Sequence, residues 1–428
     1  MKKVTVALLG AGQRGEIYTD YAIGRSYEME VVAVADPSAA RRQRIADKHG
    51  IPAERQFSSW EELFSQPKLA DAVFICTQDK MHYEPTMAAL GAGYHVMLEK
   101  PMSPEPVECI KMGQEAKKRG LVFSICHVLR YTNFFATLKQ MLEEGRIGRL
   151  MSIQHNENVA YWHQAHSFVR GNWSNSAQSS PMILQKSCHD MDILLWLAGA
   201  ECTHISSFGT LSHFRPEGAP EGATKRCLDG CPVADECPYY APKWYLTDDI
   251  GWPTSVIADD MSYESRLQAL KVGPYGRCVY HCDNDVVDHQ VVNMEFANEV
   301  TAVFTMTAFT YDSGRTLKLM GTTGEIRAHM EKNEIEIIHF KNGFRELLSL
   351  QAPGGHVGHG GGDQGLVKDF LRLVEADGAL QGRTSADISV QSHMMSFAAE
   401  KARIEKRTIS IEEFVREQLA NEAEPAMN

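Results

Sequence analysis

The glycine-rich segment from Gly10 to Gly15 constrains the fold of this 428-residue chain more than any other feature. It reads Gly-Ala-Gly-Gln-Arg-Gly and follows a continuous apolar run, 4–9, that is typical of a buried parallel strand. In a dinucleotide-binding fold the first glycine allows a tight turn, the second lets the backbone approach a pyrophosphate, and the third lets helix and strand pack closely. We therefore predict that a dinucleotide is bound by Gly10, Gly12, Gln13, Arg14 and Gly15.

A second apolar run, 31–35, ends at Asp36, about 20 residues beyond the last glycine of the motif. An acidic residue at this distance hydrogen-bonds the adenosine ribose, and its charge would repel the 2′-phosphate of NADP. Asp36 therefore favours NAD as the cofactor. Three arginines follow: Arg41, Arg42 and Arg44. They could weaken the preference for NAD over NADP, although a solvent-facing helix explains them as well.

Apolar runs and helix-like stretches continue to alternate up to about residue 125, which predicts an α/β fold with a Rossmann parallel sheet in residues 1–125. Polar side chains follow two of these runs at the sheet edge where ligands bind. Thr77 follows the run 72–76, and Glu99 and Lys100 follow the run 95–98. We expect the cofactor to be bordered by Thr77, His82, Glu99 and Lys100.

The glycine motif, Thr77 followed by His82, and Glu99-Lys100-Pro101 together resemble the glucose-fructose oxidoreductase / inositol dehydrogenase / rhizopine catabolism (Gfo/Idh/MocA) family, over essentially the whole chain. The resemblance implies that Lys100 lies beside the nicotinamide and the reacting carbinol. A partly buried ammonium there can help to remove a hydroxyl proton or polarise a carbonyl. The alternative is a surface cation at the end of a strand.

The segment 181–197 carries the other candidate catalytic residues. Its apolar residues recur every three or four positions, which predicts one continuous helix with Lys186, His189 and Asp190 on one face. The resemblance implies that His189 is the acid/base residue, since it matches the histidine of the family's Asp-x-x-x-His helix. Gln185 stands where that aspartate is usual, and Lys-x-x-His-Asp resembles a subset of the family associated with glycan processing.

We predict that His189 exchanges the substrate proton, because imidazole titrates near the working pH, and that Lys186 binds a sugar hydroxyl or lowers its pKa. The alternative is a helix packed by its leucines and isoleucines, with its polar residues facing water. That alternative explains Asp190 and Asp192 more readily than it explains Lys186 and His189.

From Leu150 onward, longer runs alternate apolar and polar residues. They predict an open, mostly antiparallel sheet with one polar face, so residues 126–428 form a second, substrate-binding α+β domain. The expected strands are 151–155, 202–208, 291–296 and 300–306. The resemblance implies that this sheet covers the nicotinamide site and pairs between subunits, so a homo-oligomer is expected.

The segment 161–173 is dense in aromatic, histidine and arginine side chains, which suits the recognition of a sugar. The substrate-binding candidates are Arg130, Tyr161, Trp162, His163, His166 and Arg170. Ordinary loop packing explains the segment nearly as well, and the two histidines also have metal-pair spacing without a nearby acidic or cysteine partner. The glycine-rich loop 355–363 either closes on the substrate or is a plain connection.

Five of the ten cysteines gather in and just after a Pro- and Gly-rich insertion, 216–253. A structural zinc site needs four thiolates or imidazoles, and such a metal could replace a missing apolar core. The expected ligands are Cys227, Cys231, Cys237 and either Cys278 or Cys282. An iron–sulfur cluster and free thiols are the alternatives, and neither metal would be needed for hydride transfer.

The net charge of −12 argues against nucleic acid or an anionic membrane as the main partner. The apolar run after Lys2 and Lys3 is shorter than the core of a typical signal peptide, and no run is long enough to span a membrane. A cytoplasmic protein is therefore expected.

These features predict an NAD(H)-dependent oxidoreductase that acts on the CH–OH group of a sugar, polyol or glycoside. One alternative is a glycosidase or lyase that uses tightly held NAD to oxidise a sugar transiently, so that the aglycone is eliminated. Another is a non-catalytic NAD-binding regulator, which the presence of both Lys100 and His189 disfavours.

Overall fold

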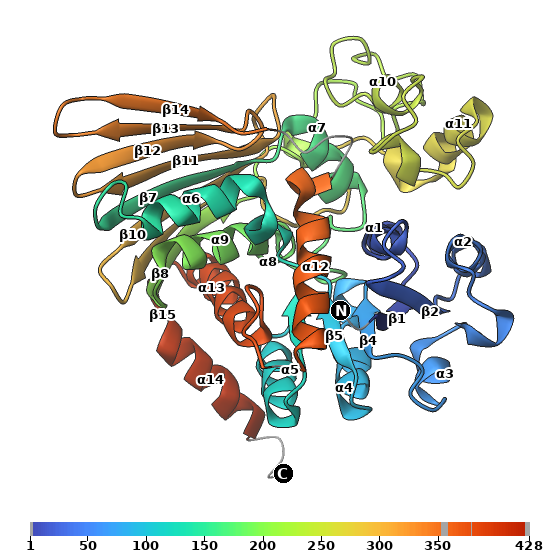
Figure 1. The fold of residues 1–428 in the computed structure, drawn as a ribbon. Helices are drawn as coiled ribbons and strands as arrows, with labels where there is room; N and C mark the ends of the chain where they lie inside the picture. Colours follow the sequence, from blue (N-terminus) through green and yellow to red (C-terminus); the bar gives the residue numbers. More distant parts are fainter. Residues whose placement is uncertain (1–2, 352–357, 378, 424–428) are drawn as a thin grey trace.

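In the computed structural model, two β-sheets lie next to each other and helices pack around both (Figure 1). The structure describes residues 3–351, 358–377 and 379–423. Residues 355–357 of the predicted glycine loop lie outside these ranges. The last residues of that loop begin helix α12 (Gly362–Glu375), so this part of it is helical.

The first sheet is the parallel Rossmann sheet that the sequence predicts. Among the described residues it has six strands in the order β3-β2-β1-β4-β5-β6, so the strand order reverses between β1 and β4, where such sheets bind ligands. The strands are β1 (Val4–Leu9), β2 (Met29–Ala35), β3 (Gln56–Phe57), β4 (Ala72–Ile75), β5 (His95–Leu98) and β6 (Phe123–Ile125). Helices flank the sheet: α1 (Gln13–Thr19), α2 (Ala39–His49), α3 (Trp60–Phe64), α4 (Tyr83–Gly91) and α5 (Pro106–Arg119).

Helix α12 comes from the C-terminal part of the chain but packs on the first sheet. The ring of Phe370 lies 5.7 Å from the ring of Phe74 on β4, and Leu366 shares an apolar core with Leu8 on β1. The boundary at residue 125 therefore separates the two sheets along the chain, while α12 returns to complete the core of the first.

The second sheet is open and mostly antiparallel, with β7 and β10 as its parallel pair. In the described part of the chain it has nine strands in the order β14-β13-β12-β11-β7-β10-β9-β8-β15. They are β7 (Leu150–Asn158), β8 (Cys202–Thr210), β9 (His289–Phe296), β10 (Thr301–Thr307), β11 (Gly314–Gly321), β12 (Gly324–His329), β13 (Glu334–His339), β14 (Arg345–Ser349) and β15 (Ile409–Ser410). The first four contain the expected strands, while β11 to β14 extend the sheet beyond the prediction.

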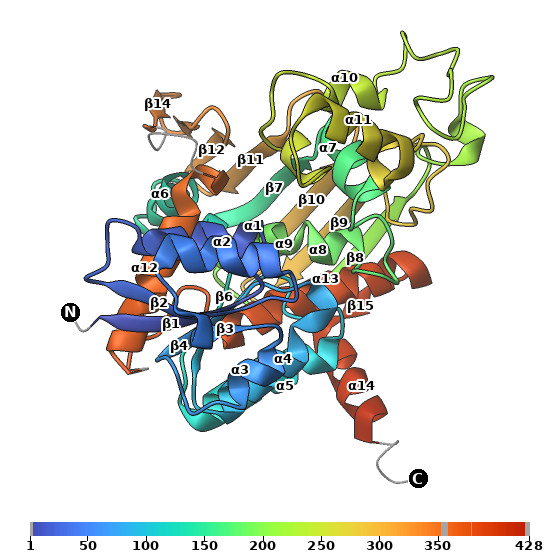
Figure 2. The same ribbon diagram turned by 90° about the vertical axis from the view of Figure 1, so that its right-hand side faces the viewer.

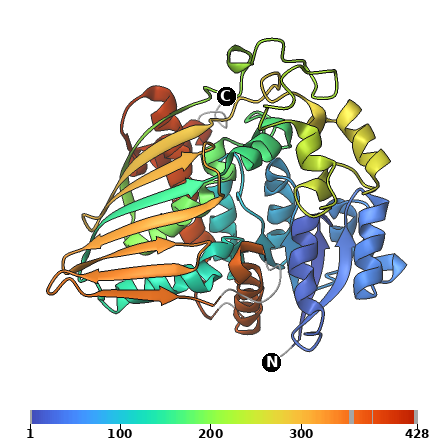
Figure 3. The same cartoon turned by 90° about the horizontal axis from the view of Figure 1, so that it is seen from above.

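Helices α6 (Asn133–Glu143), α9 (Cys188–Ala198) and α13 (Ala386–Glu405) lie along one face of this sheet (Figures 1 and 3). Burial alternates along β9 and β10, as expected for strands with one covered face. Helix α14 (Ile411–Ala423) follows the last strand. The helices on this face also lie toward the first sheet, since α13 contacts both α5 and β8.

The segment predicted as one helix, 181–197, is broken in the structure. Helix α8 (Met182–Gln185) ends at Lys186, and α9 begins at Cys188 after Ser187, whose φ and ψ of −93° and 6° leave the helical region. The periodic spacing is continuous across the break, so the sequence pattern does not reveal it. Lys186 consequently lies in the break between α8 and α9, and His189 lies in the first turn of α9.

Residues 211–288, between β8 and β9, form an insertion longer than the predicted 216–253. It holds α10 (Ala241–Tyr245) and α11 (Tyr263–Val272) and lies beside α7 (Tyr161–His163) at one end of the second sheet (Figure 2). Two small apolar clusters form its core, one around Phe214 and the other around Tyr245. The insertion thus has its own apolar core, contrary to the premise of the zinc prediction.

Within the described residues, none of the helices combines the length and apolar character that a membrane crossing requires.

Candidate active site

The glycine loop has the geometry that its sequence predicts. Gly10 has a φ of +87°, and a Cβ atom on it would lie 2.6 Å from the carbonyl oxygen of Cys76. A Cβ atom on Gly15 would lie 2.3 Å from the carbonyl oxygen of Gly10, whereas one on Gly12 would meet nothing within 4 Å. The first and third glycines are therefore required by the protein's own packing, while the surroundings of Gly12 leave room for a dinucleotide to approach the backbone.

Asp36 lies just beyond β2 and is almost fully buried. One carboxylate oxygen accepts a hydrogen bond of 2.8 Å from the backbone N–H of Ala11, and the other accepts one of 2.8 Å from that of Ser38. The carboxylate is thus fixed against the glycine loop, where it is expected to meet the ribose. Both features fit NAD, and Gln13 is exposed at the start of α1.

Arg14, a predicted cofactor residue, makes extensive contacts within the protein. Its guanidinium donates to Glu99 at 2.7 Å and to Asp363 of α12 at 2.5 Å, and it also contacts the Tyr18 hydroxyl. Burial alone would raise the pKa of Glu99, but the charges of Arg14 and Lys100 hold it below its usual value. The contacts of Arg14 with Glu99 and Asp363 therefore connect α1, the end of β5 and α12 next to the glycine loop.

His82 connects the ends of β4 and β5. Its Nδ1 lies 2.7 Å from the carbonyl oxygen of Pro101 and its Nε2 lies 3.1 Å from that of Thr77, and the side chain is buried. Thr77 in turn donates to the carbonyl oxygen of Met81 at 3.0 Å. These contacts fix the two strand ends from which the predicted cofactor residues emerge.

Lys100 reaches from the end of β5 to the second domain. Its Nζ donates a hydrogen bond of 2.9 Å to the carbonyl oxygen of Gln185, the last residue of α8. The backbone N–H of Lys100 donates to Glu99 at 2.8 Å, which orients the start of its side chain. The ammonium of Lys100 therefore contacts the end of α8, directly before the break that contains Lys186 and precedes His189.

A buried network of charges holds Lys186. Its Nζ lies 3.1 Å from a carboxylate oxygen of Glu157 on β7, whose other oxygen lies 2.7 Å from Arg315 on β11. Arg315 also binds Asp190 at 2.7 Å, and His155 lies 2.7 Å from the same carboxylate. Burial opposes the ionisation of Asp190, but the Arg315 charge and the His155 hydrogen bond lower its pKa below the usual value. The alternative in which Asp190 faces water is therefore wrong.

Sequence reasoning missed Glu157, Arg315 and His155. The signal was present in β7, where a period of two places His155 and Glu157 on the same face as the buried Ile153. Two polar residues at inward positions of a strand need partners from the elements that cover it. Extending the predicted strand by two residues would have brought Glu157 toward the helix that carries Lys186.

His127 is a further residue that the sequence did not single out. It follows β6, it is almost fully buried, and neither ring nitrogen has a hydrogen-bond partner among the described residues. Its ring centroid lies 5.8 Å from that of His189 and 5.4 Å from that of His393. Burial and the nearby charges of Arg130 and Lys100 lower the pKa of His127 to about 3, so the ring is neutral beside the candidate catalytic residues.

Three of the predicted substrate-binding side chains are held by protein groups. Arg130 makes a paired contact with Asp192, at 2.7 and 2.8 Å, so Asp192 does not face water either. Arg170 donates to the carbonyl oxygens of Arg277 and Tyr239 at 2.7 Å each, and His166 lies 2.9 Å from the Tyr245 hydroxyl. These contacts assign all three to the packing of α9 and the insertion, and we do not carry them into the proposed site.

The zinc prediction is not supported. Cys227, Cys231, Cys237 and Cys278 do line one small cavity of about 20 Å³, but no group of three or more His, Cys, Asp or Glu side chains in the described ranges could hold a metal ion. Apolar packing and arginine–carbonyl hydrogen bonds hold the insertion instead.

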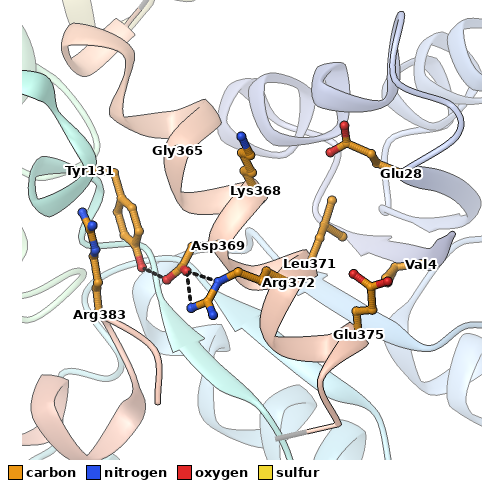
Figure 4. Close-up of a pocket in the computed structure, with 10 residues that line it drawn as sticks. All are labelled: Val4, Glu28, Tyr131, Gly365, Lys368, Asp369, Leu371, Arg372, Glu375 and Arg383. Carbon is orange, nitrogen blue, oxygen red and sulfur yellow. Dashed lines mark hydrogen bonds and ion pairs between the residues drawn. The ribbon is translucent and has the colours of Figure 1, made fainter. Parts of the chain in front are cut away.

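A cavity of about 490 Å³ beside α12 lies away from these residues (Figure 4). It is bordered by Val4, the first residue of β1, whereas the glycine loop follows the last residue of that strand. Among its lining side chains, Asp369 pairs with Arg372 and accepts a hydrogen bond from the Tyr131 hydroxyl. The cavity is therefore separate from the candidate active site.

Comparisons with known proteins agree with this geometry. Residues 4–127 match the family model described as "Oxidoreductase family, NAD-binding Rossmann fold", and residues 135–327 match the "GFO/IDH/MocA C-terminal domain". The chain is 24% identical over 361 residues to the putative oxidoreductase YteT of Bacillus subtilis, covering 81% of this chain and 82% of that one. It is 32% identical over 151 residues to D-glucoside 3-dehydrogenase of Escherichia coli, covering 34% and 40%.

Solved structures share the whole fold. A levoglucosan dehydrogenase in complex with NADH and levoglucosan superposes with a TM-score of 0.70 at 17% identity, covering 96% of this chain and 99% of that one. An oxidoreductase from Agrobacterium radiobacter in complex with NAD+, L-tartaric acid and magnesium gives a TM-score of 0.69 at 14% identity, with 96% and 98% covered.

Proposed function

The chain belongs to the Gfo/Idh/MocA family of NAD-binding oxidoreductases, and we propose that it transfers hydride at a CH–OH carbon of a sugar, polyol or glycoside with the help of Lys100 and His189. Relatives named as sugar and inositol dehydrogenases support an NAD(P)-dependent enzyme that acts on CH–OH groups. The fixed Asp36 carboxylate favours NAD over NADP.

One observation carries the proposed mechanism: the Lys100 ammonium, from the first sheet, lies 2.9 Å from the backbone of Gln185 on the second domain. The acceptor is a carbonyl oxygen, so this contact orients an ammonium and leaves its other N–H groups available for a substrate oxygen. His189 lies four residues further along the chain, and its ring faces His127 beyond β6. An amine from the first domain and an imidazole from the second thus border the same short segment, 185–189.

The residues divide the chemistry between them. When NAD is bound, its nicotinamide accepts the hydride from the carbinol carbon. Lys100 donates a hydrogen bond to the carbinol oxygen and stabilises the negative charge that develops there. His189 takes up the hydroxyl proton, and both steps run in reverse for reduction of a ketone.

One observation also favours the elimination alternative. Elimination of an aglycone needs a base for the C–H proton and an acid for the leaving oxygen, in addition to the groups that assist hydride transfer. A second ammonium, Lys186, is held by Glu157 next to the residue that Lys100 contacts. Lys186 is therefore a candidate for one of these additional roles.

The test follows nicotinamide absorbance and aglycone release while purified protein and NAD are mixed with a panel of polyols, sugars and aryl glycosides. We expect reduction of NAD with at least one substrate. Lys100→Met is expected to lower kcat by about 10²–10⁴-fold while NADH binding, followed by its fluorescence, stays unchanged. Lys118→Met, on the exposed face of α5, is the matched control.

Two results would overturn the dehydrogenase proposal. Aglycone release without net NAD consumption would favour the elimination alternative. A Lys100→Met variant as active as Lys118→Met would remove Lys100 from the mechanism.

A further inference from the structure

A continuous series of aromatic rings leads from the candidate active site onto the insertion. Ring centroids lie 6.3 Å apart for Trp173 and Phe168, 5.6 Å for Phe168 and His163, and 5.0 Å for His163 and Trp252. Trp162 continues it, 5.5 Å from Trp252. We call these five side chains the aromatic wall.

The wall begins at the residues proposed for catalysis. The backbone carbonyl of Trp173 accepts a hydrogen bond of 3.1 Å from the Gln185 side chain, and the Gln185 carbonyl accepts the one from Lys100. His163 lies five residues after the end of β7, the strand that holds Lys186 through Glu157. Burial lowers the pKa of His163, and the Lys186 charge is the next largest cause, which agrees with this proximity.

Two of the tryptophans in the wall are open to solvent. Trp173 is 37% exposed and Trp252 is 40% exposed, while Phe168 between them is buried. Large aromatic side chains left exposed together commonly mark a binding surface. The insertion fixes its end, because Trp244 stacks on Trp162 at 5.7 Å and donates a hydrogen bond of 3.0 Å to the carbonyl oxygen of Pro238.

We propose that the aromatic wall is a subsite for a second sugar ring, so that the substrate is a glycoside of at least two sugar units. This rests on the proposed function and specifies its substrate class. A sugar ring presents apolar C–H faces and polar edges, and indole rings beside polar groups match both.

The experiment compares cellobiose, maltose, hexyl β-glucoside and glucose. Binding is followed by tryptophan fluorescence and calorimetry with the full-length protein, with and without NADH, and turnover by nicotinamide absorbance where it occurs. We expect one disaccharide to bind about tenfold more tightly than glucose, and Trp252→Ala to abolish this preference without changing the response to glucose. Trp252→Phe should retain most of the preference.

Tyr263→Ala is the matched control, because Tyr263 is 51% exposed on α11 of the same insertion. Trp173→Ala is the second variant, and it is expected to act in the same direction as Trp252→Ala. Circular dichroism and the thermal midpoint establish that each variant is folded.

Three results would overturn the subsite: equal binding of disaccharide and glucose by the wild type, equal losses for both sugars in Trp252→Ala, or hexyl β-glucoside matching the disaccharide, which indicates an apolar aglycone site. Trp252-dependent disaccharide binding without any NAD turnover would support the subsite while contradicting the proposed dehydrogenase. The two proposals therefore fail separately.

Discussion

Lys186 and Glu157 form an ion pair of 3.1 Å that joins the break between α8 and α9 to strand β7. Only about a fifth of the Lys186 side chain is exposed, and Glu157 is almost fully buried. Arg315 binds the other oxygen of Glu157 at 2.7 Å, so the carboxylate lies between two cations. The position of the Lys186 ammonium thus depends on a residue of the second sheet.

Glu157→Gln is expected to lower kcat by about tenfold or more and to destabilise the fold by about 3 kcal/mol, because it leaves the Lys186 ammonium without its carboxylate and Arg315 with Asp190 alone. A double-mutant cycle with Lys186→Met, measured by urea unfolding and by turnover, would give a coupling energy of at least about 1 kcal/mol. Glu325→Gln removes a carboxylate of the same sheet that pairs with Lys318 nearer the surface. If this control lowers kcat as much as Glu157→Gln does, the pairing has no specific role.

Alanine substitutions at two glycines of the dinucleotide motif should affect different properties. Gly15→Ala should lower stability, whereas Gly12→Ala should weaken NADH binding. Gly15→Ala places a Cβ atom 2.3 Å from the Gly10 carbonyl oxygen, so we expect a clear fall in the thermal midpoint. Gly12→Ala meets no protein atom within 4 Å, so the midpoint should stay near that of the wild type while NADH affinity falls by about tenfold or more. Calorimetric unfolding and NADH fluorescence measure the two effects. Retained NADH binding in Gly12→Ala would contradict the assignment of the loop.

The cofactor preference should depend on the charge of Asp36. Asp36→Asn keeps one carbonyl oxygen to accept the hydrogen bond from Ala11 and removes the charge that repels a 2′-phosphate. The ratio of kcat/KM for NADP to that for NAD is expected to rise by about tenfold or more. Asp47→Asn, on the exposed face of α2, controls for a general change in charge. An unchanged ratio would mean that Asp36 serves only to hold the loop.

The sequence predicted the first sheet and its ligand edge well because local signals specify both. Apolar runs, fixed glycine positions and Asp36 each depend on neighbours close in the chain, and the matched family models confirm the Rossmann assignment. Long-range contacts were harder to predict. The return of α12 and the Arg315–Asp190 pair depend on partners more than a hundred residues away. The break at Lys186 is contacted by Glu157 and Lys100, which belong to other elements of the chain.

The zinc prediction failed for a related reason. Close cysteine spacing correctly suggested that the thiols come together, since four of them line one cavity. The spacing did not reveal the apolar clusters that pack the insertion or the buried Arg170 that binds its backbone. The catalytic roles of Lys100 and His189, the cytoplasmic location and the homo-oligomeric state stay predictions.

Three buried histidines should make the fold sensitive to mild acid. Burial lowers the pKa of His127, of His166 and of His393 to about 3 each. In the unfolded chain a histidine has a pKa of about 6.5, so the unfolded state binds these protons first. The stability that the neutral rings contribute is therefore fully present above about pH 6.5 and is lost as the pH falls toward 3.

Between pH 7 and pH 5.5, each of the three histidines is expected to remove about 1 kcal/mol of unfolding free energy, measured by urea titration. His127→Phe removes one titrating group without breaking a hydrogen bond between described residues, so it should reduce the proton uptake on unfolding by about one at pH 5. His204→Phe, at a largely exposed position on β8, is the matched control. Equal proton uptake in the wild type and His127→Phe would show that the buried ring does not resist protonation. Because His127 lies beside His189, the same variant also reports whether the imidazole of His127 is needed for turnover.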